Sequence, residues 1–420
     1  MMTTRRATII AVLVAVAALA GCGGGGDPPG GEPSPPPGAG GGGTAAEFVG
    51  VAAVAPDFSS GAHALVERED PFTTQLDLSP TISDIDVTCR SDALFRVERF
   101  QRDNITRFDL DAPGTAVWQY SAQDDPDDPV SANPRAPIFA NDTKAYLLRY
   151  GKPTVWIIDP TATVEADFKT GELDLSSYTD DLVDAGGAPS DPDGTPEPET
   201  GVIVDGKLFI AMQRLDRNDG FRPLTAFVAV FDVATDSEID TMTHPDVFGI
   251  ELPVQNPQDI QYSPELDRVF VQAVGRFGSG DSPPELTGGL VAIDPDTYTV
   301  ELRVDDGTAE DNPIGQINGF ALVDRNTGYL IGSQGFLDTS LYRFDPETGL
   351  IDGGNPTPQP VAGLAGVDIR DLAVDAQKRL WIARGDGTPG LQILDPATDT
   401  LREERIPTNL IPAQVSLCQD

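Results

Sequence analysis

A strand pair repeated seven times constrains the fold of this chain more than any other sequence feature. Each copy has a short apolar strand, followed by a second strand that ends in aspartate. The apolar strands begin at Ala64, Leu94, Ala145, Leu208, Val269, Tyr329 and Leu380. The closing aspartates are Asp77, Asp109, Asp159, Asp232, Asp294, Asp345 and Asp395. Beyond a short first interval the copies lie about 50–65 residues apart, as in four-stranded propeller blades. We therefore predict an all-β fold, a seven-bladed β-propeller, with six or eight blades as alternatives.

Turn chemistry indicates how each predicted blade is oriented. Four of the closing aspartates open a D-x-x-T turn, as Asp294 and Asp345 do. Asp bonds its own backbone in such turns, and a following Pro presets φ. If strands run A to D from the channel outward, the apolar strand is B and the aspartate ends C. The B–C and D–A loops then share one face, and the D-x-x-T hairpins occupy the other.

The combination of an aromatic–aliphatic strand, an "IDPxT"-like turn and an alternating strand resembles the YVTN-repeat propellers of exported prokaryotic proteins. The resemblance extends from Phe48 to Pro407, although no copy spells Tyr-Val-Thr-Asn. It implies the propeller fold and an exported setting. It does not imply a particular activity, because one fold hosts many functions.

The N-terminal segment is typical of an exported lipoprotein. Arg5 and Arg6 precede an apolar run over 7–20 that is too short to span a bilayer, and Cys22 follows Gly21. We predict a signal peptide over 1–21, a lipid anchor on Cys22 with a Gly/Pro-rich tether over 22–45, and a propeller domain over 46–420. The alternative is an ordinary signal peptide. Gly23 favours an outer-membrane destination, so the expected membrane contact is through the anchor.

Composition excludes several classes of function. The formal net charge is −39, and a surface so acidic repels nucleic acid and anionic lipid. Only two histidines occur, His63 and His244, which argues against zinc sites and Ser-His-Asp chemistry. The acidity itself suits either a solvated surface or divalent-cation binding.

Three enlarged connections point to one face as the binding face. The B–C loops over 213–226 and 275–288 are long, and the D–A connection over 170–200 enters the first of these blades. Insertions in repeat folds often carry the binding surface. The candidate ligand-binding residues are Gln213, Arg214, Asp216, Arg217, Phe221, Arg222, Arg276 and Phe277. Such arginines either clamp an anionic ligand or pair with nearby aspartates to brace the loops.

The D–A connection also carries a candidate calcium site. Asp191, Asp193, Glu197 and Glu199 lie close together around Gly194. Calcium takes six to eight oxygen ligands, which closely spaced carboxylates can supply. The spacing is not that of an EF-hand, and the interspersed prolines fit a solvated acidic loop equally well.

Two cysteines remain after Cys22, and an oxidising envelope favours their pairing. Cys89 ends a strand that is expected to be innermost in the second blade. Cys418 ends a C-terminal strand, which would complete the first blade and lie beside it. Val51–Val54 competes for that inner place. We predict a disulfide between Cys89 and Cys418, with two unpaired buried thiols as the alternative.

Two functions remain in competition. The first is a non-catalytic envelope module that binds a protein, a peptide or a glycan. The second is a calcium-dependent hydrolase or lactonase-like propeller enzyme, in which the ion would act as Lewis acid. The scarcity of histidine and the lack of a convergent catalytic motif favour the binding module.

Overall fold

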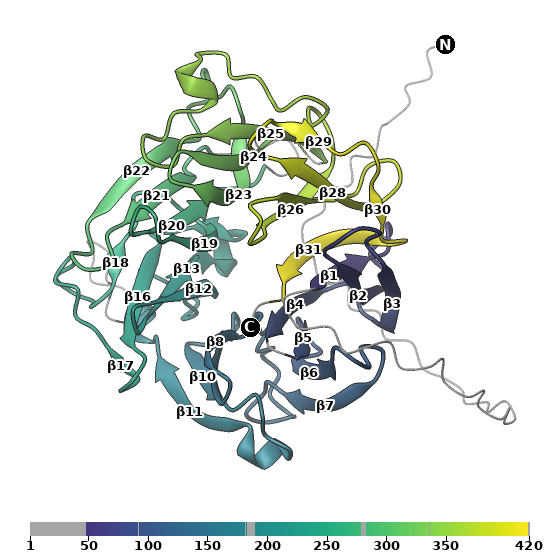
Figure 1. Ribbon diagram of the computed structural model, residues 1–420. Helices are drawn as coiled ribbons and strands as arrows, with labels where there is room; N and C mark the ends of the chain where they lie inside the picture. The colour runs from purple at the N-terminus through teal and green to yellow at the C-terminus, as the bar shows by residue number, and fades with distance from the viewer. Residues whose placement is uncertain are drawn as a thin grey trace, which may run out of the picture.

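The structure is a computed structural model that describes residues 48–418, except 91, 181, 183–189, 279–282 and 336. The predicted signal peptide, Cys22 and the tether lie outside the described residues. Seven sheets form blades around a central channel, which confirms the predicted seven-bladed β-propeller (Figure 1). No helix in the described part of the chain has the length and hydropathy needed to cross a bilayer.

The first four blades follow from the inside outward. Blade 1 contains β31 (Ile411–Leu417), β1 (Phe48–Val54), β2 (Gly61–Glu67) and β3 (Thr74–Thr81). Blade 2 contains β4 (Ile85–Arg90), β5 (Ala93–Glu98), β6 (Asn104–Asp109) and β7 (Ala116–Ser121). Blade 3 contains β8 (Ile138–Asn141), β9 (Lys144–Leu147), β10 (Thr154–Ile158) and β11 (Lys169–Asp174). Blade 4 contains β12 (Pro198–Val204), β13 (Lys207–Met212), β16 (Phe227–Asp232), and a divided outer strand, β17 (Ser237–Glu238) and β18 (Ile250–Glu251).

Blades 5 to 7 complete the ring. Blade 5 contains β19 (Pro257–Ser263), β20 (Arg268–Ala273), β21 (Gly289–Ile293) and β22 (Val300–Asp305). Blade 6 contains three strands, β23 (Gln316–Asp324), β24 (Thr327–Gly335) and β25 (Asp338–Phe344). Blade 7 contains β26 (Ile369–Val374), β27 (Leu380–Arg384), β28 (Gly390–Asp395), and the short β29 (Thr400–Leu401) and β30 (Ile406–Pro407). Outside the blades lie β14 (Leu215–Asp216), β15 (Arg222–Pro223), helix α1 (Ser177–Asp180), and 3-10 turns at Glu165–Asp167, Arg217–Asp219 and Asp352–Gly354.

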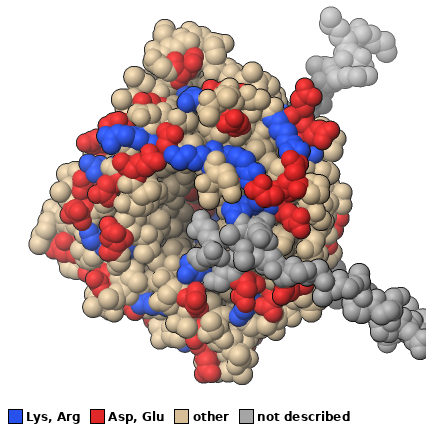
Figure 2. Space-filling view, in the orientation of Figure 1, with Lys and Arg blue, Asp and Glu red and all other residues tan. Residues whose placement is uncertain are grey.

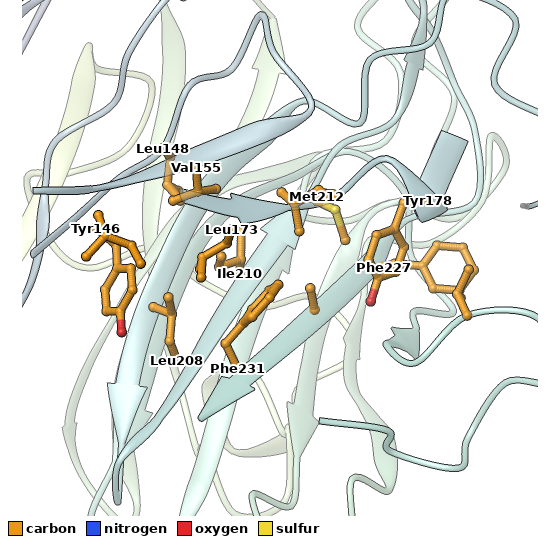
Figure 3. Close-up of a cluster of buried hydrophobic side chains, with 14 of the residues drawn as sticks. Tyr146, Leu148, Val155, Leu173, Tyr178, Leu208, Ile210, Met212, Phe227 and Phe231 are labelled. Atoms are coloured by element: carbon orange, nitrogen blue, oxygen red, sulfur yellow. The ribbon is translucent and has the colours of Figure 1, made fainter. Parts of the chain in front are cut away.

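The strands bury their apolar residues between neighbouring blades. The middle strands β9, β13 and β16 are buried almost throughout, because both of their faces meet another blade. Figure 3 shows one such layer, in which Tyr146 and Leu148 of blade 3 pack against Leu208, Ile210 and Phe231 of blade 4. Such packing explains the nearly continuous apolar runs in the repeat.

The first blade is assembled differently from the sequence prediction. The prediction placed Ala64–Val66 in the second strand of its blade, but these residues lie in β2, the third strand. The reason is that β31 occupies the innermost position and displaces β1 by one place. Val51–Val54 is therefore in the second strand. In the other six blades the predicted apolar strand is second, as expected.

The C-terminal strand closes the ring and carries the predicted disulfide. Figure 1 shows the yellow β31 beside the purple β1, so that the two ends of the chain share one blade. Cys418 is bonded to Cys89 of β4, with a Cα–Cα distance of 4.4 Å. The predicted disulfide is confirmed. Val87 and Cys89 also donate backbone hydrogen bonds to Gln414 and Ser416 of β31, so polar contacts reinforce the same junction.

The two faces of the ring are defined by their loops. We call the face that gathers the B–C and D–A connections the mouth face, and the face of the A–B and C–D hairpins the hairpin face. The disulfide lies where inner strands end, on the hairpin face. Phe48, the first residue of β1, is there too, because its carbonyl accepts a hydrogen bond from the Cys418 amide.

On the hairpin face, one blade clasps the C–D hairpin of the next. Lys144 of blade 3 donates to the Val233 carbonyl at 2.7 Å and to Asp236 at 2.7 Å, and the Tyr146 hydroxyl donates to Asp236 at 2.7 Å. The same arrangement recurs between blades 6 and 7. There Arg343 donates to the Pro396 carbonyl, and both Arg343 and Tyr329 donate to Asp399. The D-x-x-T turns therefore provide interblade contacts as well as tight turns.

Acidic and basic side chains are interspersed on the surface. In Figure 2, blue and red side chains lie next to one another across the visible face. The whole chain has 28 Lys and Arg residues and 67 Asp and Glu residues, so most cations have an acidic neighbour available. Exposed pairs of this kind contribute at most about 1 kcal/mol each.

Candidate binding face

The long B–C loop of blade 4 forms a small ribbon of its own. Its strands β14 and β15 pair antiparallel, with Leu215 opposite Pro223 and Asp216 opposite Arg222. Asp216 also caps the 3-10 turn that follows, accepting hydrogen bonds from the amides of Asn218 and Asp219. Asp216 is thus used for local structure, and the loop is ordered through its own backbone.

Arg214 fastens this loop to the D–A connection. Its side chain is buried and donates to the Thr225 carbonyl and to the Ser190 hydroxyl, both at 2.8 Å. Its Nε lies 3.6 Å from a carboxylate oxygen of Asp191. Two of the three predicted enlarged connections are therefore joined, and Arg214 lies inside the joint rather than on the surface.

Arg217 makes a second joint between the same two connections. Its Nε lies 2.8 Å from Glu197, whose side chain is fully buried, and its amide donates to Asp193 at 2.7 Å. Burial raises the pKa of Glu197 well above its usual value, and the Arg217 charge opposes that rise. The pair stabilises the loop, because leaving either charge alone in this environment would be costly.

The remaining predicted ligand residues divide between exposed and buried positions. Arg222 is paired with Asp219 at 2.7 Å and Arg276 with Glu285 at 2.9 Å, both near the surface. Gln213 is buried, where it accepts a hydrogen bond from the Tyr150 hydroxyl and donates to the Pro257 carbonyl. All four predicted arginines thus have acidic partners, the arrangement expected if they brace loops.

Two predicted residues remain well exposed. Phe221 is 44% exposed and Phe277 is 55% exposed, on the B–C loops of adjacent blades 4 and 5. Their rings are free to contact a ligand.

The four carboxylates of the candidate calcium site point to different partners. Asp191 faces Arg214, Glu197 faces Arg217, and Glu199 is bonded to Arg135. Asp193 accepts hydrogen bonds from the backbone of the two loops. In the described residues no group of three or more His, Cys, Asp or Glu side chains is arranged to hold a metal. The Arg charges beside three of the four carboxylates also disfavour a cation at this position.

A ring of β-bulges surrounds the channel at the mouth. Five inner strands each insert one extra residue near their first residues, where β12, β19, β23, β26 and β31 begin. The extra residues are Glu199, Gln258, Asn318, Arg370 and Ala413. Bulges redirect side chains and are frequent at barrel rims and binding sites. The mouth is therefore irregular in the same way in five blades.

Acidic groups follow or accompany these bulges. Asp371 accepts backbone hydrogen bonds from Val415 and Leu372, yet burial, followed by the charges of Asp259 and Asp86, raises its pKa to about 7. Burial also raises the pKa of Glu199, to about 8. Burial therefore favours the protonated form of both carboxyl groups in the folded protein.

Tyr150 lies between arginines at the same mouth. The Arg135 guanidinium is 4.5 Å from the centre of its ring, and that of Arg217 is 5.8 Å away. Arg135 is buried and bonded to Glu199, while its Nε and Nη1 atoms have no hydrogen-bond partner. Sequence analysis missed Arg135, Tyr150 and Asp371, and it named Glu199 only as a calcium ligand. A polar residue near the start of each inner strand was the available signal, but the sequence does not show which strands meet.

Apolar side chains are exposed on four B–C loops. Phe58 of blade 1 and Leu337 of blade 6 are 42% and 43% exposed, and they join Phe221 and Phe277 on the mouth face. Phe58, Phe221 and Leu337 have φ values of 57°, 60° and 62°. Left-handed backbone is strained for a bulky side chain, and such strain concentrates at functional sites.

Comparison with known proteins supports the fold alone. No family model matches the chain, and no curated protein matches it. A structure described as a "putative 6-phosphogluconolactonase" from Bacteroides fragilis is similar, with a TM-score of 0.55, 12% identity, and coverage of 88% of this chain and 97% of that one. A second so described, from Bacteroides uniformis, has a TM-score of 0.54 and 12% identity, covering 88% and 99%. Kuenenia stuttgartiensis hydrazine synthase has a TM-score of 0.53 and 12% identity, covering 85% and 95%.

Proposed function

We propose that this chain is a lipid-anchored, extracytoplasmic binding module that holds a protein, peptide or glycan on its mouth face without transforming it. The observation that carries the proposal is the group of exposed apolar side chains on four B–C loops. Apolar side chains held out of the core on strained backbone are expected where a partner will cover them. The enlarged loops and the bulged inner strands lie on this same face.

The position of β1 supports the proposed anchoring. Its first residue, Phe48, lies on the hairpin face. A lipid on Cys22, linked through the Gly/Pro-rich segment, would join the ring on the hairpin side. The mouth face would then be directed away from the membrane and toward a partner.

The histidines are placed away from the mouth chemistry. His63 lies buried between blades 1 and 2, with Nε2 2.7 Å from the Pro113 carbonyl and Nδ1 3.1 Å from Arg96. His244 lies in the excursion that divides the outer strand of blade 4. Neither is positioned to act as a base toward a ligand in the channel.

The binding face can be tested with the mature protein in detergent micelles. We would screen it against a random peptide phage library and a glycan array. Phe58→Gly, Phe221→Gly, Phe277→Ser and Leu337→Gly, made together, should abolish the specific hits. The matched control is Val164→Ser with Leu350→Ser, which removes two equally exposed side chains from the hairpin face. Hits that survive the first variant and are lost in the control would contradict the proposed face.

The anchor has a separate test. Cys22→Ser should abolish labelling by radioactive palmitate and release the protein from membranes, since acyl chains provide the attachment. Continued labelling of this variant would disprove the proposed lipidation.

One observation favours a second function, a lactonase-like hydrolase. Asp371 and Asp259 face the same channel, and the raised pKa of Asp371 suits a general acid or base near neutral pH. A lactone-hydrolysis assay distinguishes the two functions. Turnover by the wild-type protein that Asp371→Asn abolishes would support the enzyme and overturn the non-catalytic proposal.

A further inference from the structure

A groove crosses the mouth face between blades 6, 7 and 1, away from the loops that the sequence singled out. Its volume is about 350 Å³, and its apolar walls come from Pro56, Phe58, Leu337, Val367 and Ile411. Phe58 and Leu337 belong to B–C loops of different blades, and both line this groove. A volume of this size accommodates large side chains of a ligand.

The charged groups inside the groove are already used by the protein. Asp368 is bonded to Arg370 at 2.9 Å, while Asp386 is bonded to Arg384 at 2.8 Å and to Arg405 at 2.9 Å. Both carboxylates are therefore bound to arginines of the protein itself, and neither is available to a cation of the ligand. The interior of the groove therefore suits an uncharged, apolar side chain.

The loops that form its edges carry acidic groups without cations. Asp57 precedes Phe58, and Asp338 follows Leu337; both are exposed. In the described part of the chain neither forms an ion pair, and Asp57 accepts hydrogen bonds only from Ser59. Each apolar side chain thus has a free carboxylate beside it, on a protein whose formal net charge is −39. Charge complementarity selects a basic partner.

We infer that this groove binds a segment of a partner protein in which apolar side chains are flanked by lysine or arginine. The inference rests on the proposed binding function and names the partner's chemistry. The apolar side chains enter between Phe58 and Leu337, and the flanking cations meet Asp57 and Asp338. Phe58 and Leu337 carry their exposed side chains on left-handed backbone and both line the groove.

The positive φ values of Phe58 and Leu337 allow their side chains to be removed without straining the backbone. Glycine adopts positive φ without strain, so Phe58→Gly and Leu337→Gly remove the side chains and relieve the backbone together. Met242→Gly is the control, because Met242 is an exposed, left-handed apolar residue between β17 and β18 of blade 4, outside the B–C loops. Asp57→Asn and Asp338→Asn test the charges while keeping the shape.

The probe is a fluorescent hexapeptide in which a Phe-Leu pair lies between two lysines on each side, and its binding to the mature protein is measured by fluorescence anisotropy. Phe58→Gly with Leu337→Gly should weaken binding about tenfold or more, as for central contact residues. Met242→Gly should leave it unchanged. The two asparagine substitutions should weaken binding and reduce its dependence on salt. A peptide with glutamates in place of the lysines should not bind.

Each other outcome overturns the inference in a distinguishable way. If only Phe221→Gly with Phe277→Ser weakens binding, the groove is wrong but the mouth face stands. If the wild-type protein binds the peptide and no mouth-face variant weakens this binding, the mouth face is not the binding face and the proposed function is wrong on this point as well. If wild type does not bind the peptide, the basic–apolar partner is wrong. A wild-type dimer by sedimentation that the double glycine variant converts to monomer would make the occupant a second copy of this chain.

Discussion

The mouth face and the hairpin face of this propeller are formed by the two ends of the same strands but differ in their regularity and in their contacts. On the hairpin face the turns are alike, and their aspartates accept bonds from the preceding blade, as Asp236 and Asp399 do. On the mouth face five inner strands are bulged, and Phe and Leu side chains of four B–C loops are exposed. The difference teaches that regularity serves cohesion of the ring, whereas irregularity leaves groups available to a ligand.

The strongest test of this contrast removes the disulfide that joins inner strands on the hairpin side. Cys89→Ala with Cys418→Ala should lower the free energy of unfolding by about 2–5 kcal/mol, since the crosslink spans 329 residues and restricts the unfolded chain. Urea unfolding measures this loss. Reducing agent should lower wild-type stability similarly and leave the variant unaffected. Peptide binding at the mouth should persist; its loss would show that the two faces are coupled.

The next test separates a buried joint of the mouth face from an exposed one. Arg217→Gln leaves Glu197 buried without its cation, so we expect a loss of about 3 kcal/mol, felt by the two loops. Arg222→Gln removes an exposed pair and should cost less than about 1 kcal/mol. Hydrogen exchange over 190–226 measures the difference. Equal exchange in both variants would refute the bracing role of Arg217.

The channel carboxylate Asp371 predicts a component of the pH dependence of stability that its substitution should remove. The pKa of Asp371 is about 7 in the folded protein and near 3.8 when unfolded, so folding favours its protonated form. Its contribution is therefore present at low pH and is lost as pH rises from about 4 to about 7; between pH 5 and pH 8 the loss is about 2.6 kcal/mol. Asp371→Asn should remove this component from urea unfolding measured between pH 5 and pH 8. An identical pH profile in the variant would contradict the assignment.

The smallest effect concerns a single clasp on the hairpin face. Tyr146→Phe removes the hydroxyl that donates to Asp236 across blades, and should cost about 1.5–2 kcal/mol, as for a hydrogen bond to a charged group. Tyr262→Phe is the matched control, because its hydroxyl donates to Asp267 within one blade at an exposed position. Thermal unfolding compares them. An equal loss in both would mean that the interblade position gives no added stability.

The blades and the hairpin-face turns were predictable from the sequence, whereas the contacts on the mouth face were less so. The repeat predicted the blades and the turns, because strand periodicity and D-x-x-T turns are local signals. The Cys89–Cys418 pairing was predicted from the expected inner positions of the two strands that end in these cysteines. The repeat placed Ala64–Val66 one strand too far inward, because only the pairing of β31 with β1 decides that position.

The mouth was less predictable for a physical reason. The sequence located the enlarged loops, yet which carboxylate pairs with Arg214 or Arg217 depends on connections that meet only in the folded ring. The mouth position of Asp371 likewise depends on a bulge that shifts the register of β26 by one residue, which a sequence pattern of period two does not reveal.

The pairing of β31 with β1 also sets an order in time. During synthesis the first three strands of blade 1 are made early, while the inner edge of β1 has no partner until the chain reaches residue 417. An exposed strand edge is a template for unwanted pairing with other chains. A nascent chain of this protein therefore carries an open β edge for nearly its whole synthesis, and its dependence on chaperones should end abruptly once the last strand has been made.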